Sequence, residues 1–177
     1  MSDLAKLSVI EMADNIQNGS ISPVDLVEAH LQRIDMLNPK LNAFIHVDHE
    51  GARSAALLAT QRLAKGEPSR PLEGVPISIK SSIAVRGFPL ECGSALRRGI
   101  RAEADAPLVR RLKAAGAILL GNTNVPEFLM AWETNNKLYG HTDNPWDLQR
   151  TAGGSSGGES AAIAAHLSAA GIGSDGG

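Results

Sequence analysis

Residues 74–80 read Gly-Val-Pro-Ile-Ser-Ile-Lys, and this stretch decides the fold that the sequence predicts. Apolar and polar side chains alternate from Val75 to Lys80, which is the two-residue period of a β-strand. Residues 105–115 then have the pattern of a capped helix, and residues 117–120, Ala-Ile-Leu-Leu, that of a short buried strand. A strand, a helix and a second strand in this order predict an α/β fold with a largely buried sheet.

The segment before this strand is predicted to be helical over the first 65 residues. Residues 22–25, Ser-Pro-Val-Asp, form a typical helix start, with the serine as N-cap and the proline at the first helical position. The pair Asn38-Pro39 is predicted to end this helix, because the residue before a proline disfavours helical backbone. A second helix is expected at about residues 51–65. His30 lies on the apolar stripe of the first helix, which favours a packed core histidine over a metal ligand.

Residues 153–158, Gly-Gly-Ser-Ser-Gly-Gly, are interpreted as a turn. A flexible linker of this composition would continue with polar residues, but an alanine-rich stretch follows at once and predicts a helix over about residues 159–170. Residues 121–152, which precede the turn, are rich in Asn, Pro and Thr and are predicted to be a loop. Residues 171–176 match the nucleotide-binding pattern G-x-G-x-x-G, but they follow a helix instead of a first strand, so a nucleotide site is disfavoured.

Composition and charge exclude several classes of function. The length of 177 residues suits one domain, and the net charge of −2 argues against a surface that follows nucleic-acid phosphates. Cys92 is the only cysteine, so no intrachain disulfide can form and a reducing compartment is the simplest interpretation. The N-terminus lacks the pattern of a secretory signal, and no apolar run approaches the roughly 18 residues of a membrane span. We therefore expect a soluble cytoplasmic protein with no nucleic-acid partner and no membrane span.

Three stretches of the sequence together resemble the signature of an enzyme family. They are residues 74–80, residues 153–159 and residues 173–177. A Gly-Val-Pro lysine strand, a Gly-Gly-Ser-Ser-Gly-Gly turn and a Gly-x-Asp-x-Gly-Gly/Ala-Ser turn are features of the amidase signature family, and the spacing between Lys80 and Ser155 is similar to that in the family. The resemblance implies a central mixed β-sheet flanked by helices. Residues 1–66 would be a helical N-terminal segment and residues 67–177 the start of the α/β core, so the chain would be the N-terminal portion of a single catalytic domain.

The resemblance also implies a reaction, the hydrolysis of amide-type C–N bonds through an acyl-enzyme on a Ser-Ser-Lys triad. Lys80 would be the lysine of the triad. Ser155 would be its middle serine, held by a cis peptide bond after Gly154. The nucleophilic serine is expected two positions beyond Gly177. The family pattern implies no cofactor and no metal ion.

Four more residues acquire expected roles from the same resemblance. Gly176 and Gly177 would supply backbone N–H groups to an oxyanion hole, and Ser156 and Ser174 would orient the triad. One departure from the family pattern is visible, because many members have an acidic residue directly after the lysine, whereas this chain has Ser81 there.

The segment of residues 128–132 is similar to the acyl-pocket segment of the family. Met130 and Trp132 would then face the substrate, and the acyl group would be apolar or aromatic. Ordinary core packing is the alternative interpretation for both side chains.

Such a triad needs a particular environment. A serine hydroxyl is a poor nucleophile until a base removes its proton. Lysine can be that base only if burial lowers its pKa from about 10.4 towards about 7 to 8. A hydroxyl can pass the proton on, because it donates one hydrogen bond while accepting another.

Three hypotheses about function remain open at this point. The first is a hydrolase for small-molecule amides or related acyl derivatives such as hydrazides or anilides, for which a homodimer is left open. The second is the A subunit of a tRNA-dependent glutamine amidotransferase, which would need partner chains. The third is a non-catalytic fragment, inactive and poorly soluble when expressed alone because its sheet would have an open edge.

Overall fold

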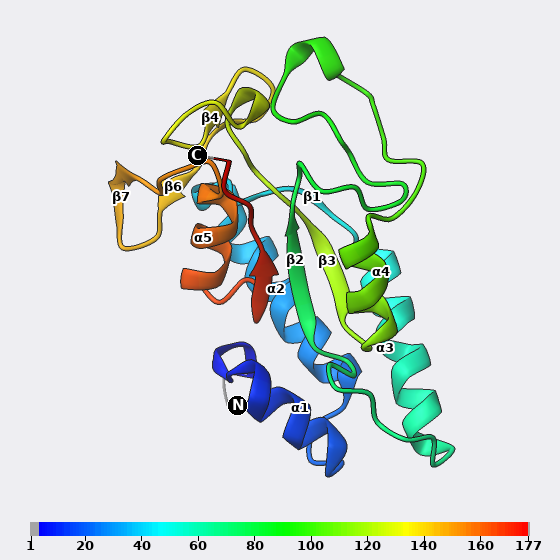
Figure 1. The fold of residues 1–177 in the computed structure, drawn as a ribbon. Coiled ribbons are helices and arrows are strands. Elements are labelled where there is room, and N and C mark those ends of the chain that lie inside the picture. The colour runs from blue at the N-terminus through cyan, green and yellow to red at the C-terminus, as the bar shows by residue number, and fades with distance from the viewer. Residues whose placement is uncertain (1–3, 177) are drawn as a thin grey trace.

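The computed structural model describes residues 4–176 and has a four-stranded mixed sheet at its centre (Figure 1). β2 pairs in parallel with both β3 and β8, whereas β1 runs antiparallel to β3. The predicted α/β class, with helices flanking a central mixed sheet, is confirmed. The strands in spatial order are β1 (Phe44–Val47), β3 (Ile118–Thr123), β2 (Pro76–Lys80) and β8 (Ala170–Ile172).

The described residues form five α-helices around this sheet. Ser22 caps the second of them by accepting a hydrogen bond from the Asp25 backbone N–H, as its sequence predicts. The helices are α1 (Val9–Gln17), α2 (Pro23–Leu41), α3 (His49–Ala64), α4 (Pro107–Ala114) and α5 (Gly157–Ala164), and three short 3-10 helices add η1 (Leu4–Lys6), η2 (Ala95–Arg97) and η3 (Glu127–Leu129).

Two apolar clusters form the core, and the isoleucines of β2 belong to one of them. Ile77 and Ile79 pack with residues of α1 and α4 in one cluster. The other cluster joins α2, α3 and α5 to side chains of β3. Because side chains alternate along a strand, Ser78 and Lys80 point to the opposite side from Ile77 and Ile79. The lysine at the end of β2 therefore faces α5.

The N-terminal segment departs from the sequence prediction at two places. α2 continues past Asn38-Pro39 to Leu41, because Asn42 ends it in a left-handed conformation with its N–H bonded to the Asn38 carbonyl. The segment is also not wholly helical, since β1 follows α2 and pairs with β3. His30 is buried in the core as predicted, and its Nδ1 lies 2.8 Å from the Leu26 carbonyl oxygen.

The C-terminal segment departs from the prediction as well. The helix expected over residues 159–170 ends at Ala164, and Ala170 begins β8, because pairing with β2 overrides the helix propensity of alanine. The predicted loop of residues 121–152 begins with the last residues of β3 and contains two small hairpins. These are β4 (Asn135–Asn136) with β5 (Gly140–His141), and β6 (Asp143–Asn144) with β7 (Asp147–Thr151).

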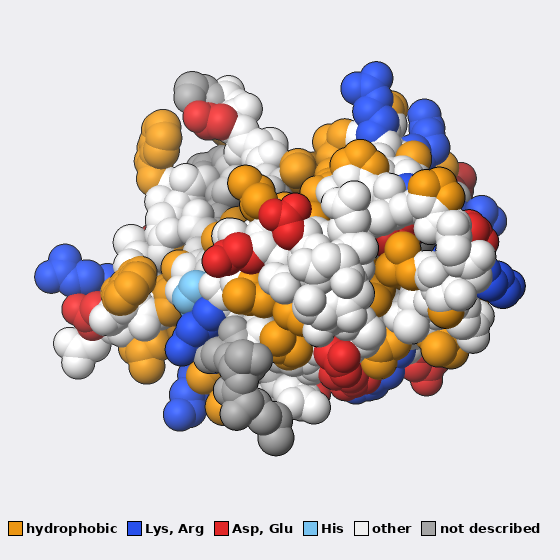
Figure 2. Space-filling view, turned by 90° about the horizontal axis from the view of Figure 1, so that it is seen from below, with side chains coloured by type: hydrophobic (Ala, Val, Ile, Leu, Met, Phe, Trp, Pro, Cys, Tyr) orange, Lys and Arg blue, Asp and Glu red, His pale blue; other side chains and the backbone are white. Residues whose placement is uncertain are grey.

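The surface carries mixed charge. On the face shown in Figure 2, basic side chains lie mostly towards the edges, with acidic and apolar side chains between them, in keeping with the net charge of −2. Among the helices of residues 4–176, none is long and apolar enough to cross a membrane.

Candidate active site

The amine of Lys80 is the centre of the candidate site. The side chain is fully buried at the end of β2, where three oxygen atoms surround its Nζ. Nζ lies 2.7 Å from the hydroxyl of Ser155, 2.8 Å from the hydroxyl of Ser156 and 2.9 Å from the carbonyl oxygen of Ser174. Residues that the sequence places in three separate stretches thus meet around one nitrogen.

The turn before α5 places the two serines. The peptide bond between Gly154 and Ser155 is cis. Thr134 holds this turn from the neighbouring segment, because its hydroxyl donates to the Gly153 carbonyl at 2.9 Å and accepts from the Gly157 N–H at 3.0 Å. Ser155 and Ser156 therefore face Lys80 from a fixed backbone.

Close packing explains why Gly158 follows the serines. A Cβ atom at Gly158 would lie 2.4 Å from the backbone nitrogen of Asn124 and 2.8 Å from the carbonyl oxygen of Ala43. Only a residue without a side chain lets the start of α5 approach this backbone so closely. The glycine brings the serine turn against the end of β3.

Burial controls the protonation of the lysine. Removal of the amine from water lowers the pKa of Lys80 below its usual value, while the negative charges of Asp175 and Glu159 act in the opposite direction. A lowered pKa increases the fraction of neutral amine near neutral pH. Within the described part of the chain, no cluster of His, Cys, Asp and Glu could hold a metal ion.

Glu159 is a polar residue of the site that the sequence reasoning did not identify. Its carboxylate is buried and accepts hydrogen bonds of 2.5 Å from the hydroxyls of Ser78 and Thr123. Burial raises the pKa of Glu159 to about 7. The only sequence signal was an acidic residue at the start of an alanine-rich helix, which is also typical of an exposed first turn.

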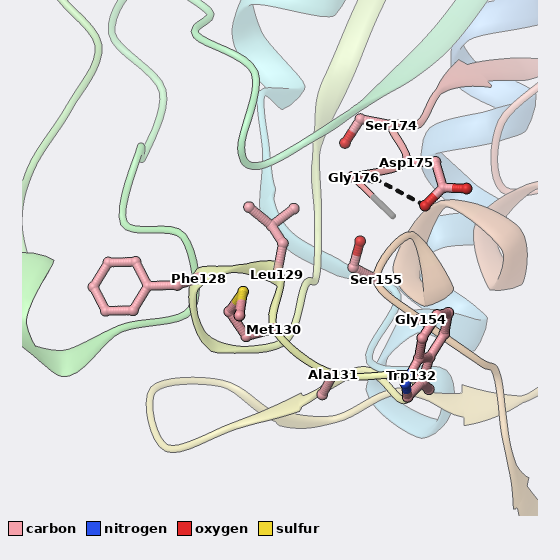
Figure 3. Close-up of a pocket in the computed structure, with 10 residues that line it drawn as sticks. All are labelled: Phe128, Leu129, Met130, Ala131, Trp132, Gly154, Ser155, Ser174, Asp175 and Gly176. Carbon is pink, nitrogen blue, oxygen red and sulfur yellow. Dashed lines mark hydrogen bonds between the residues drawn. The ribbon is translucent and has the colours of Figure 1, made fainter.

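A cleft of about 480 Å³ opens beside Ser155 (Figure 3). The side chain of Leu129 points into the space in front of Ser155, whereas Phe128 points away from it, and Trp132 lies beside Gly154. Met130 and Trp132 line the cleft and are 86% and 85% exposed, so neither fills the core.

The expected oxyanion-hole residues are only partly described. Gly176 lines the cleft, and its N–H donates to the carboxylate of Asp175 at 2.9 Å. Gly177 lies outside the described residues. The oxyanion-hole role of both glycines stays a prediction. Ser174 contacts Lys80 through its backbone carbonyl, not through its side chain.

Comparison with known proteins places the chain among amidases. The family model described as Amidase matches residues 25–177. The A subunit of glutamyl-tRNA(Gln) amidotransferase from Salinispora arenicola is 45% identical over 99% of this chain, and the match covers 36% of that relative. This chain therefore spans about a third of the length of the curated relatives that it matches.

Solved structures give the same result. One is an inhibitor-bound protein complex that reveals the origins of an s-triazine catabolic enzyme, at 42% identity and a TM-score of 0.89 over 92% of this chain and 36% of that chain. Another is fatty acid amide hydrolase, at 27% identity and a TM-score of 0.93 over 97% of this chain and 30% of that chain.

Proposed function

Because the chain belongs to the amidase signature family, we propose that the full-length protein hydrolyses an amide-type C–N bond with Lys80 as base and Ser155 as proton relay. The observation that carries this proposal is the 2.7 Å contact between the buried Lys80 amine and the Ser155 hydroxyl. Burial lowers the pKa of this amine, which favours the neutral form that a base requires.

The hydrogen bonds around Lys80 support one direction of proton transfer. A neutral amine has two hydrogens and one lone pair. The carbonyl of Ser174 can only accept, so it takes one hydrogen from Nζ. The hydroxyl of Ser156 gives its own hydrogen to the same carbonyl, so its oxygen takes the second hydrogen from Nζ. The lone pair is left for Ser155, whose hydroxyl donates to it and whose oxygen can accept from a nucleophile.

The proposed reaction then has two halves. The serine expected two positions beyond Gly177 attacks the amide carbon; its proton moves to the oxygen of Ser155, and the proton of Ser155 moves to Lys80. The ammonium returns a proton through Ser155 to the leaving nitrogen, the C–N bond breaks and an acyl-enzyme remains. Water repeats the sequence as nucleophile and releases the carboxylic acid.

Two substrate classes remain, and glutamine in a tRNA-dependent assembly has the stronger support. The curated relatives, at up to 45% identity over nearly the whole chain, are named as the A subunit of glutamyl-tRNA(Gln) amidotransferase. We therefore propose that the full-length protein releases ammonia from glutamine inside a tRNA-dependent assembly with partner chains. This order reverses the one that the sequence alone favours, in which the small-molecule amidase comes first.

A small-molecule amidase is the second candidate, and the cleft favours it. Leu129, Met130 and Trp132 give the cleft an apolar wall, which suits an apolar acyl group better than the polar side chain of glutamine. The structural neighbour connected with s-triazine catabolism is 42% identical, similar to the amidotransferase relatives.

Hydrolysis by the full-length protein, followed as ammonia release from glutamine and primary amides and as hydrazine release from hydrazides, tests these proposals. The protein is assayed alone and with its partner chains, on glutamine and on a panel of acyl amides and hydrazides. Glutamine hydrolysis only in the assembly supports the amidotransferase role, and hydrolysis of acyl amides by the protein alone supports the second candidate. Normal activity of Lys80→Ala would remove Lys80 as the base, while Lys65→Ala, an exposed lysine at the end of α3, is the control. Residues 1–177 alone are proposed to be inactive, since the nucleophile is expected beyond them.

A further inference from the structure

The buried carboxylate of Glu159 connects three strands of the sheet. Ser78 donates to it from β2 and Thr123 donates to it from β3. The backbone N–H of Ile172 in β8 is a third hydrogen-bond donor. One side chain on the first turn of α5 thus receives hydrogen bonds from every parallel strand of the sheet.

These contacts lie directly below the candidate site. Ser78 precedes Lys80 by two residues on the same side of β2, and Ile172 precedes Ser174 by two residues along the chain that leaves β8. Ile172 is also the partner of Ile79 in the pairing of β2 with β8. Ser156 immediately precedes the turn of α5 that carries Glu159. Displacement of Glu159 would therefore shift the contacts of Lys80 with both Ser156 and Ser174.

We propose that Glu159 is a positioning residue of the amide hydrolysis, which holds β2, β8 and the start of α5 in register beneath Lys80 and whose negative charge acts on the buried amine. This inference rests on the proposed function of Lys80 as base. Glu159 does not line the cleft, so it acts through the lysine and not on the substrate.

The negative charge of Glu159 should shift the protonation of Lys80 in one direction. The groups that face it are the neutral Ser78 and Thr123 hydroxyls, the Ile172 N–H and the Lys80 amine, which is the charged group that acts on it. Asp175 acts on the lysine from the side of the cleft. A carboxylate at position 159 favours the ammonium form of Lys80 and opposes its action as a base. Glutamine at this position keeps hydrogen-bonding atoms and removes the charge.

The test compares Glu159→Gln and Glu159→Ala in the full-length protein, with Glu50→Gln, an exposed acid on α3, as control. Rates are measured against pH on the amide that the wild type hydrolyses. The acid limb of kcat/KM should move to lower pH by roughly one pH unit in Glu159→Gln. Glu159→Ala should lower kcat about 10- to 100-fold with little change in KM, because the contacts of Lys80 are displaced while residues 128–132, the apolar wall of the cleft, stay in place.

A second measurement separates this inference from the proposed function. The ionisation of Lys80 is followed by NMR of labelled lysine, with the signal assigned from Lys80→Arg. A lower Lys80 pKa in Glu159→Gln supports the coupling even if the wild type hydrolyses no amide, an outcome that would overturn only the proposed function. An unchanged acid limb and an unchanged Lys80 pKa in Glu159→Gln would overturn the inference, whether or not Glu159→Ala folds.

Discussion

Ser156 and Ser174 form two hydrogen bonds with each other beside the buried lysine. The hydroxyl of Ser156 donates to the Ser174 carbonyl at 3.1 Å, and the Ser174 N–H donates back to the same hydroxyl oxygen at 3.3 Å. The start of α5 is thereby joined to the chain that leaves β8. Lys80 contacts both groups, so this pair fixes where two of its hydrogens point.

Replacement of Ser156 tests this arrangement. Ser156→Ala removes one acceptor of the amine, so the lone pair of neutral Lys80 is no longer directed at Ser155 alone. We expect kcat of the full-length protein to fall by about 10- to 100-fold, which is less than the roughly 10²- to 10⁴-fold contribution of a general base, because the base is misdirected but not removed. Ser160→Ala, an exposed serine on the same helix, should keep normal kcat. Equal rates in both variants would show that Ser156 does not orient the base.

Removal of the buried amine should stabilise the protein. The folded state disfavours the ammonium form of Lys80, so its pKa lies below the unfolded value of 10.5. The resulting loss of stability is absent above pH 10.5, grows as pH falls from 10.5 to the folded pKa, and stays constant below it. Lys80→Met should therefore raise the free energy of unfolding at neutral pH by about 0.5–2 kcal/mol while abolishing hydrolysis. Denaturant titrations at pH 7 and pH 10.5 check this, and a destabilised Lys80→Met at pH 7 would contradict it.

Glu159 should give the free energy of unfolding a second pH dependence, opposite in sign to that of Lys80. Its folded pKa of about 7 lies above the ordinary value of 4.5, so the neutral carboxyl fits the fold best. This contribution is present below pH 4.5 and is lost as pH rises through 7. Between pH 5 and pH 8 the wild type should lose about 2.5 kcal/mol of stability relative to Glu159→Gln. If the free energies of unfolding of the wild type and of Glu159→Gln changed with pH in parallel over that range, the raised pKa of Glu159 would be refuted.

Because α5 approaches neighbouring backbone so closely at Gly158, one added methyl group there should lower the stability of the protein strongly. In Gly158→Ala the new Cβ would meet backbone atoms of Asn124 and Ala43, which cannot rotate away. We expect a loss of about 1–3 kcal/mol in the free energy of unfolding, and more if the turn is displaced. Ser160→Ala again serves as the control. A Gly158→Ala protein with wild-type stability would show that α5 can move away from β3 without loss.

The two exposed tryptophans should differ in their effect on substrates. Trp132 lines the cleft beside Ser155, while Trp146 is equally exposed, at 85%, in the hairpin of β6 and β7. Trp132→Ala should raise KM for amides with large acyl groups by about 10-fold and leave small amides unaffected, because one aromatic contact is lost. Trp146→Ala should leave KM unchanged for both large and small amides. Identical KM values for both variants would place the acyl group elsewhere.

The sequence predicted the contact between Lys80 and Ser155 more fully than it predicted the strands and helices. Lys80 and Ser155 lie in short motifs with fixed spacing, and their contact follows once the motifs are paired. β1 and β8 were missed because their strand character depends on pairing with β3 and β2, which no local window contains. The partners of Glu159 were missed for the same reason, since three strands distant in sequence create its environment.

The apolar wall of the cleft and the proposed base belong to different parts of the fold. Lys80 ends an inner strand, whereas residues 128–132 lie in a connecting segment outside the sheet. Under the proposed function, variation in that segment would alter which acyl groups are accepted without moving Lys80 or Ser155. Substitutions of these wall residues, in nature or in a directed-evolution library, would therefore change substrate preference with little effect on kcat. A first library can be confined to residues 128–132.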